Sequence, residues 1–265
     1  MIPSLLQIPS AVSDSKLHSV LPNNGKGNFT FNRSTGATRI NKDGLIEEVG
    51  YFSSELVQNG DFSELGSEAL INGDFATDSD WSKGTGWVIM NGYAESDGTN
   101  APLDQVSRLT IGKTYKVVIT VTNMTSSALS VRLGTSSSNA VLSILENGTY
   151  TAYGVAGATT FRLRSQGFDG RIQNVSVKQV DPNDRWSLGT GFSFAEDGLK
   201  FTNLGGAATV QNPVWYLNKT YKVTVNLSYT SGTRIILPYD GSNTSNSISV
   251  NTAGTNVTYS YTITP

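Results

Sequence analysis

The sequence predicts an all-β protein, in which an N-terminal extended and hairpin segment precedes two tandem jelly-roll-like β-sandwiches, the second of them incomplete. Three observations support this prediction. Short runs of alternating apolar and polar residues recur along the chain, Gly-containing turns separate these runs, and no segment has the helical period of about 3.6 residues. Residues that satisfy turn backbones (Ser, Thr, Asn and Gly) are abundant, whereas only 15% of the residues are charged.

Residues 1–54 form the N-terminal segment and differ in character from the rest of the chain. Three prolines in its first half predict an extended backbone there. The pair Asp43-Gly44 separates two short β-compatible runs, 37–41 and 45–49, and predicts a β-hairpin. A segment of this size cannot hold a large core alone. We therefore expect it to pack against a neighbouring domain, another copy of the chain or a larger assembly, and we interpret it as an anchor.

The first β-sandwich module spans residues 55–180. Asn-Gly and Asp-Gly turns separate its short strands, a combination that indicates a sandwich or jelly roll. The predicted strands are 87–90, 93–95, 115–122, 129–133, 140–145, 149–153, 160–164 and 173–179. The module begins with a local duplication, because the motif NGDF stands at 59–62 and again at 72–75. We expect only one copy to occupy the module's structural position, and we favour the second, which lies close to Trp81.

A second module, residues 185–265, repeats the first. The motif KTYKV occurs at 113–117 and at 219–223, and the motif Trp-Ser-x-Gly-Thr-Gly begins at Trp81 and at Trp186. The two offsets, 219 − 113 = 106 and 186 − 81 = 105, differ by one residue, which indicates duplication of a whole module. The last two strands of the first module have no counterparts in the second. We therefore expect the second module to be truncated, either within a longer chain or as a fold that a partner chain completes.

Composition excludes several classes of function. The 19 lysines and arginines are scattered through a chain of net charge −2, whereas nucleic-acid-binding surfaces cluster such residues. No run approaches the roughly 18 apolar residues of a membrane span. The N-terminus lacks the basic region of a secretory signal peptide. Because the chain has no cysteine, disulfides and thiolate metal sites are excluded as well.

Residues suited to catalysis are sparse. The single histidine, His18, has no nucleophile pattern near it, and no hydrolase, metalloprotease or phosphate-binding motif occurs. Among the carboxylates, Glu95, Asp97 and Asp104 are turn-prone. Glu47 and Glu48 occupy adjacent strand positions, which point to opposite faces. A glycosidase needs two carboxylates at a set separation across one site. We therefore predict that the protein is not an enzyme.

Aromatic residues beside loops are better candidates for a binding site, because the flat faces of tryptophan and tyrosine stack on sugar rings. Trp81 and Trp186 each follow a loop. Trp215 and Tyr216 are adjacent, so one of the two should point away from the core. Tyr239 precedes an Asp-Gly turn. Packing in a core is the alternative interpretation for each of them.

Residues 29–47, FTFNRSTGATRINKDGLIE, resemble the opening of many tail and appendage proteins of bacteriophages, in which a similar stretch precedes β-rich modules. The pattern that follows resembles the jelly-roll carbohydrate-binding modules found in such proteins and in glycoside hydrolases; it consists of NGDF, Trp81, GTGW at 84–87, KTYKV and GRIQNVSVKQV at 170–180. The resemblance covers nearly the whole chain, and its N-terminal part is the more specific. It implies a virion structural protein, such as a head or tail fibre, with sugar-binding-like folds.

The same resemblance raises the question of a structural calcium ion near the NGDF turn. In the carbohydrate-binding family, the position of Gln173 usually carries an aspartate that helps to hold this ion. Calcium prefers carboxylate and backbone oxygens. Asp74 remains as one possible ligand, but Gln173 lacks the negative charge. This departure weakens the case for calcium, and we predict no cofactor.

Together these expectations describe a virion component without a signal peptide. Residues 1–54 would bind other virion proteins, and the modules would project outward and bind host-surface glycans. A homotrimer would bury the small N-terminal segment and the exposed strand edges. The alternative is a secreted, non-catalytic carbohydrate-binding module of a larger polysaccharide-degrading protein. The sequence specifies neither the glycan and the host nor the point of attachment to head, collar or tail.

Overall fold

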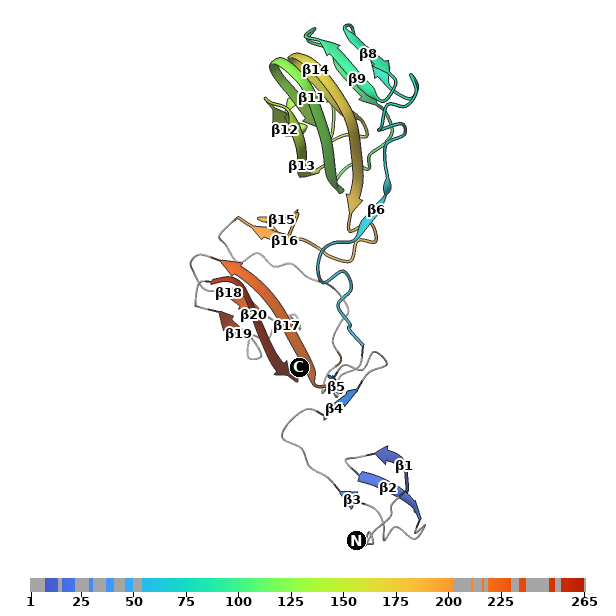
Figure 1. Cartoon of the computed structure of the whole chain (residues 1–265). Coiled ribbons are helices and arrows are strands. Elements are labelled where there is room, and N and C mark those ends of the chain that lie inside the picture. The colour runs from blue at the N-terminus through green and yellow to red at the C-terminus, as the bar shows by residue number, and fades with distance from the viewer. Residues whose placement is uncertain are drawn as a thin grey trace. The chain divides into compact units, whose positions relative to one another are not determined.

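The computed structural model of the chain is all-β (Figure 1). It describes residues 8–13, 16–21, 29–30, 37–40, 46–49, 54–202, 211, 216, 219–229, 234–236, 248–250 and 254–264. The chain divides into two compact units. One unit contains 56–217, 234–250 and 265, and the other contains 1–55, 218–233 and 251–264. No helix among the described residues has the length and apolar character that crossing a membrane requires.

The first module is built on two unusually long strands, β11 (Thr114–Arg132) and β14 (Phe161–Val180). They run antiparallel and side by side along the whole module (Figure 1), from Tyr115 opposite Gln179 to Arg132 opposite Arg162. The other members of this sheet are β6 (Leu65–Glu68), β7 (Ser82–Lys83), β8 (Trp87–Met90), β9 (Tyr93–Asp97), β10 (Pro102–Gln105), β12 (Ala140–Ile144) and β13 (Gly148–Val155).

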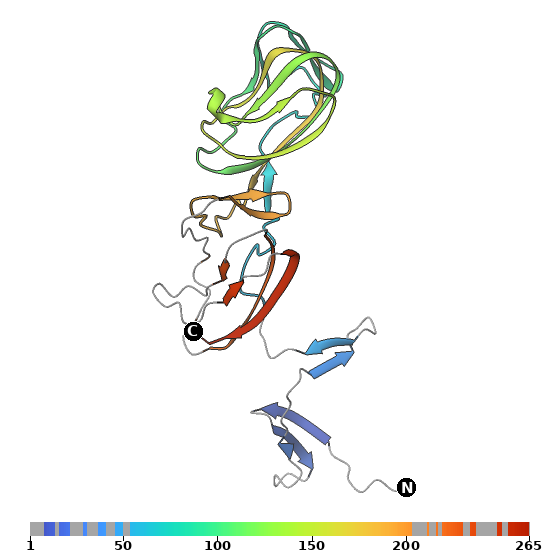
Figure 2. The same ribbon diagram turned by 90° about the vertical axis from the view of Figure 1, so that its left-hand side faces the viewer.

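The long strands belong to both layers of the sandwich. The first half of β11 pairs with β13, and its second half pairs with β12. In the same way β14 pairs with β10 near its start and with β9 and β6 further on. Between the halves the register of β11 shifts, and Asn123 and Ser127 take positive φ angles of 52° and 58°. These irregularities bend the sheet over on itself, so that it forms a nearly closed sandwich (Figure 2).

Alternation along the strands builds the core of this module. On β11 the buried side chains are Tyr115, Val117, Ile119 and Val121, and the residues between them are partly exposed. From the other strands come buried side chains that include Leu103, Phe161, Leu163, Phe168 and Ile172. Burying one such side chain contributes about 1.5–3 kcal/mol. Because the chain has no cysteine, burial of these side chains, and not disulfide bonds, stabilises the module.

The N-terminal segment contains more regular structure than the sequence predicts. β1 (Ile8–Ser13), β2 (Lys16–Leu21) and β3 (Phe29–Thr30) form a three-stranded antiparallel sheet where we expected an extended chain. The predicted hairpin is present, because β4 (Ala37–Ile40) pairs with β5 (Ile46–Val49). The Asp43-Gly44 turn between them lies outside the described residues.

The repeat in the second half of the chain is visible in its hairpins. β15 (Phe192–Ala195) and β16 (Gly198–Phe201) pair as β8 and β9 do, 105 residues earlier. Separate pairs are formed by β17 (Tyr221–Tyr229) with β20 (Gly254–Ile263) and by β18 (Arg234–Ile236) with β19 (Ile248–Val250). Among the described residues β17 pairs only with β20, and no strand takes the place beside it that β14 takes beside β11.

Candidate functional site

The two copies of NGDF form the same turn. Asn59 and Asn72 take positive φ angles of 50° and 53°, and each carbonyl oxygen accepts a hydrogen bond from the Phe three residues on, at 3.1 and 3.2 Å. The asparagine side chain completes the turn, because its Oδ1 accepts the backbone N–H five residues on. This donor is Glu64 in the first copy, at 2.9 Å, and Thr77 in the second, at 3.2 Å.

Each turn also has its own tryptophan. Trp81 donates its indole N–H to the carbonyl oxygen of Asn72 at 3.0 Å, and Trp186 donates to that of Asn59 at 2.9 Å. The rings pack on the phenylalanines of their turns, with centroid distances of 5.2 Å for Phe75 and Trp81 and 4.9 Å for Phe62 and Trp186. In the first module it is the second NGDF copy, beside Trp81, that occupies the structural position, as the sequence predicts. The first copy occupies the equivalent position beside Trp186, 127 residues further along the chain.

A glutamine near each NGDF copy also makes equivalent hydrogen bonds with the residue before that motif. Gln105 exchanges two hydrogen bonds with the backbone of Ile71, of 3.2 and 2.6 Å. Gln211, which lies 211 − 105 = 106 residues later, exchanges two hydrogen bonds with the backbone of Gln58, of 2.8 and 2.7 Å. The segment around the first NGDF copy therefore has its partners in 181–211, although the sequence places residues 55–64 in the first module.

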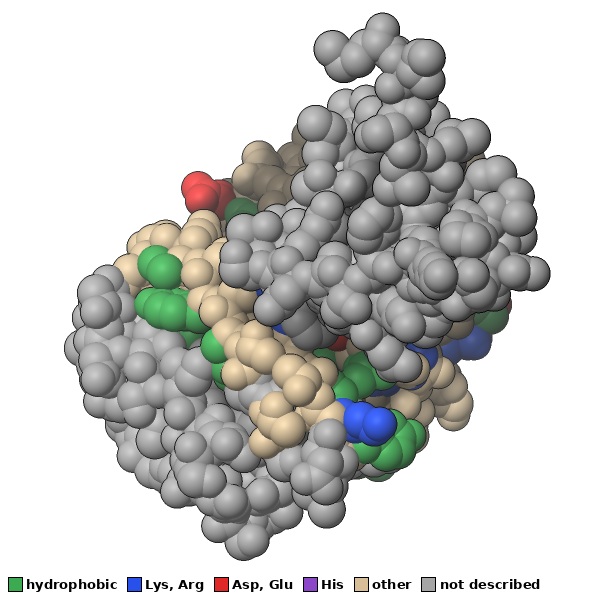
Figure 3. Space-filling view, turned by 90° about the horizontal axis from the view of Figure 1, so that it is seen from below, with side chains coloured by type: hydrophobic (Ala, Val, Ile, Leu, Met, Phe, Trp, Pro, Cys, Tyr) green, Lys and Arg blue, Asp and Glu red, His purple; other side chains and the backbone are tan. Residues whose placement is uncertain are grey.

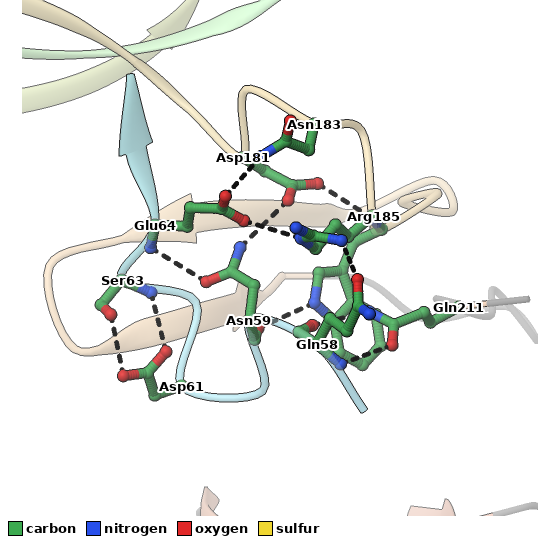
Figure 4. A network of polar contacts seen from close by, with 10 residues as sticks. Gln58, Asn59, Asp61, Ser63, Glu64, Asp181, Asn183, Arg185 and Gln211 are labelled. Atoms are coloured by element: carbon green, nitrogen blue, oxygen red, sulfur yellow. Dashed lines mark hydrogen bonds and ion pairs between the residues drawn. The ribbon is translucent and has the colours of Figure 1, made fainter. Parts of the chain in front are cut away.

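Charged and amide side chains hold these segments together (Figure 4). The Asp181 carboxylate accepts from the Asn59 side chain at 3.0 Å and from the backbone N–H of Trp186 at 2.9 Å. Arg185 donates to Glu64 at 2.9 Å and also to Gln58. We call Gln58, Asn59, Glu64, Asp181, Arg185 and Trp186 the insertion junction.

The first module thus lies between an NGDF turn and the tryptophan that completes this turn. Its two ends meet at the insertion junction, because Leu65 of β6 pairs with Val180 of β14. Directly beyond them, the backbone N–H of Asp181 donates to the carbonyl oxygen of Glu64 at 3.0 Å. Both ends of the module therefore reach the same point, and its strands extend from there as a single unit.

A groove of about 440 Å³ lies beside the insertion junction. One wall comes from the start of β11 and the end of β13, and the other from residues 180–194. Its aromatic lining consists of Tyr153, Trp186, Phe192 and Phe194, and its charged lining of Lys113, Asp181 and Asp184. Lys113 and Asp184 form an ion pair of 2.5 Å across it. Both side chains are exposed to solvent, so this pair contributes at most about 1 kcal/mol to stability.

The aromatic residues predicted as glycan-binding candidates lie in different environments. Trp81 is only 7% exposed and packs on Phe75 and Phe161, so it is a core residue and cannot stack on a sugar. Trp186 is half-buried and borders the groove. Tyr216 is 73% exposed. Trp215 and Tyr239 lie outside the described residues.

Sequence reasoning missed Tyr153, a half-buried residue near the end of β13. It lines the groove, and its ring lies 5.6 Å from the Lys116 ammonium group. The signal in the sequence is weak, because Tyr153 continues the alternation of a strand like many core residues. Phe192 and Phe194 also line the groove, and their place there depends on the hairpin of β15 and β16 that carries them.

Asp74, the possible calcium ligand, makes a contact within its own turn. The side chain of Asp74 is exposed, and its Oδ1 accepts the backbone N–H of Ala76 at 3.3 Å within its own turn. No three acidic or histidine side chains converge on a common point anywhere in the described part of the chain.

Neither a protein-family model nor a curated protein matches this sequence. On the face seen in Figure 3, the visible basic side chains of the described residues lie among hydrophobic and uncharged ones. What the described site offers instead is an open groove with several aromatic side chains and a few charged groups. Such a lining suits a sugar, whose rings have apolar faces and whose hydroxyls form hydrogen bonds.

Proposed function

We propose that the protein is a non-enzymatic structural component of a bacteriophage particle, a head or tail fibre or appendage, that displays β-sandwich modules for attachment to host-surface glycans. The aromatic groove beside the insertion junction carries the glycan-binding part of this proposal. Tyr153 and Trp186 come from its two walls, so a sugar ring could contact both. Lys113 and Asp184 provide a donor and an acceptor for sugar hydroxyls at the same place.

The state of the acidic residues supports a binding role over a catalytic one. Glycoside hydrolysis needs one carboxyl group that gives a proton and a second that acts as base or nucleophile. Asp181 is buried, and its two oxygens accept from Asn59 and Trp186. Asp184 is engaged by Lys113. Asp181 is thus fully engaged in structural contacts, which leaves Asp184 without a second free carboxylate in the groove.

The virion part of the proposal is supported by the sequence of the N-terminal segment and by the repeated modules. A weak glycan site becomes an effective attachment device when several copies are displayed on one particle, because binding of the first copy raises the effective concentration of the rest. A homotrimer anchored through residues 1–54 would provide such a display. The same groove would serve the alternative, a secreted carbohydrate-binding module, so the two must be separated by location.

Two measurements test the proposal. Mass spectrometry and labelled cryo-microscopy of purified phage particles should find the chain in the particle; a chain that occurs only as a free monomer would contradict the virion role. A glycan array should show binding that falls about tenfold or more in Tyr153→Ala, as expected for a lost stacking contact of about 1.4 kcal/mol. Tyr93→Ala is the matched control, because Tyr93 contacts Arg171 away from the groove. An array on which the unmodified chain binds nothing would leave only the structural role.

A further inference from the structure

A second surface of the first module carries an unusual concentration of positive charge. Arg132 on β11 lies directly opposite Arg162 on β14, and Ser130 lies opposite Arg164. On the other side of β14, Asp104 of β10 lies opposite Arg162. Residues opposite each other in a sheet share a face. We call Ser130, Arg132, Arg162, Arg164 and Asp104 the arginine face; Leu103, Val131 and Leu163, between them in sequence, point into the core.

The charges on this face do not cancel. Asp104 binds Arg162 through both carboxylate oxygens, at 2.9 and 2.7 Å, and so neutralises one guanidinium group. Among the described residues no carboxylate pairs with Arg132 or Arg164. Like charges at opposite positions in a sheet destabilise it. Two guanidinium groups therefore remain without a counter-charge.

Arg132 is the central group. Its side chain is only 9% exposed, and its Nε donates to the Ser130 hydroxyl at 3.0 Å. Burial, then the charges of Arg164 and Arg162, lower the pKa of Arg132 below its ordinary value. Placing three guanidinium groups together with a single carboxylate is electrostatically unfavourable. An anion bound on this face would supply the missing partner and remove much of that cost.

We propose that the arginine face binds a single oxyanion, a carboxylate or a sulfate, on an acidic polysaccharide. The planar guanidinium fork matches both groups through two parallel N–H···O hydrogen bonds. Asp104 borders the face and repels further negative charge, which favours an isolated anionic group over the closely spaced phosphates of a nucleic acid. This inference goes beyond the proposed function, because it concerns a different surface and stands whether or not the aromatic groove binds a neutral glycan.

Calorimetric titration of the full chain tests the proposal. Tetragalacturonic acid is the carboxylate probe, its fully methyl-esterified form is the neutral match, and a heparin tetrasaccharide is the sulfate probe. We expect at least one acidic probe to bind, the ester not to bind, and added salt to weaken binding. Arg164→Gln should weaken that binding about tenfold or more, the effect of losing one charge-assisted contact.

Two further variants make the test specific. Arg171→Gln should leave binding unchanged, because Arg171 lies on the same strand but pairs with Glu95. Asp104→Asn removes the only negative charge of the face and should strengthen binding several-fold. Arg164→Gln should melt no lower than the unmodified chain, since it relieves repulsion on Arg132.

The proposal is overturned if neither acidic probe binds, or if Arg164→Gln binds as tightly as the unmodified chain. It is also overturned if a single-stranded oligonucleotide binds to the arginine face as tightly as the better acidic probe. If Tyr153→Ala no longer binds the acidic probe while Arg164→Gln binds it normally, the anion site lies in the groove and not on the arginine face.

Discussion

Asn59 and Asn72 show how much of the two NGDF turns depends on one residue type. Each asparagine holds a backbone conformation that most residues disfavour, and its side chain accepts an N–H five residues on. Asparagine tolerates positive φ because its short polar side chain can bond locally. The NGDF motif is thus recognisable in the sequence as a turn. Its four residues do not specify which tryptophan donates a hydrogen bond to the asparagine carbonyl oxygen.

This dual role of Asn72 can be separated by two substitutions. Asn72→Ala should lower the free energy of unfolding of the first module by about 2–3 kcal/mol, since it loses the hydrogen bonds and strains the backbone. Asn72→Gly keeps the backbone relaxed and should cost about 1 kcal/mol less than alanine. Urea denaturation measures both values. Equal losses in the two variants would show that backbone conformation is not part of the role.

The stability of the fold at low pH depends in part on the carboxylate of Asp97. Hydrogen bonds from the Thr99 side chain, and then from its backbone N–H, lower the pKa of Asp97 below its ordinary value of 3.8. A lowered acid pKa stabilises the fold above the ordinary value, and this contribution is lost as the pH falls through the folded-state pKa. Carbon-detected NMR titration should give Asp97 a midpoint below 3.8, and Thr99→Ala should raise it. Thr77→Ala is the control, and an ordinary midpoint for Asp97 in the unmodified chain would refute the assignment.

At the scale of strands, the sequence correctly predicts strand segments of the first module, but it does not show which of these segments join into one long strand. The predicted strands 115–122 and 129–133 are parts of one strand, β11, and 160–164 and 173–179 are parts of β14. Alternation fails between the halves of β11, where the register shifts. A bulge and a turn look alike in sequence, because both interrupt the period of two. Only pairing with the partner strand distinguishes them.

The glutamine bridge is an element-scale feature that the sequence analysis did not identify. Gln105, at the end of β10, is fully buried and joins this strand to the chain before the NGDF turn through Ile71. Gln105→Ala should lower the free energy of unfolding by about 1–3 kcal/mol, because it removes two hydrogen bonds and leaves a cavity. Thermal unfolding measures this. The matched control is Gln166→Ala on the exposed side of β14, and an equal effect in both variants would contradict the bridge.

At the scale of the whole molecule, two nearly equal offsets predict a duplication, but they do not show how the two copies are arranged along the chain. A tandem reading assigns residues 55–64 to the module that follows them. The contacts of Gln58, Asn59 and Glu64 go instead to residues 181–186 and 211. Two identical NGDF motifs cannot show which tryptophan each one binds, because long-range packing determines that choice. The same limit explains why Trp81, a core residue, and Trp186, a groove residue, look equivalent in sequence.

This arrangement predicts the stability of fragments. A fragment of residues 65–180 should unfold in a single transition at the same temperature as a fragment of 55–180, because 55–64 makes its contacts elsewhere. Extending the fragment to 55–202 should raise protection of the Asn59 and Trp186 amide groups in hydrogen exchange, since their partners are then present. If 55–180 proves clearly more stable than 65–180, the first NGDF copy belongs to the first module after all.

The meeting of Glu64 and Asp181 at one point has a mechanical consequence. When opposite ends of this polypeptide are pulled apart, tension reaches the network around Asn59, Asp181 and Arg185 before it reaches β6 and β14. While those bonds hold, the nested sandwich carries no load and stays folded. Under such tension the insertion junction would therefore break before the sandwich between Glu64 and Asp181 unfolds.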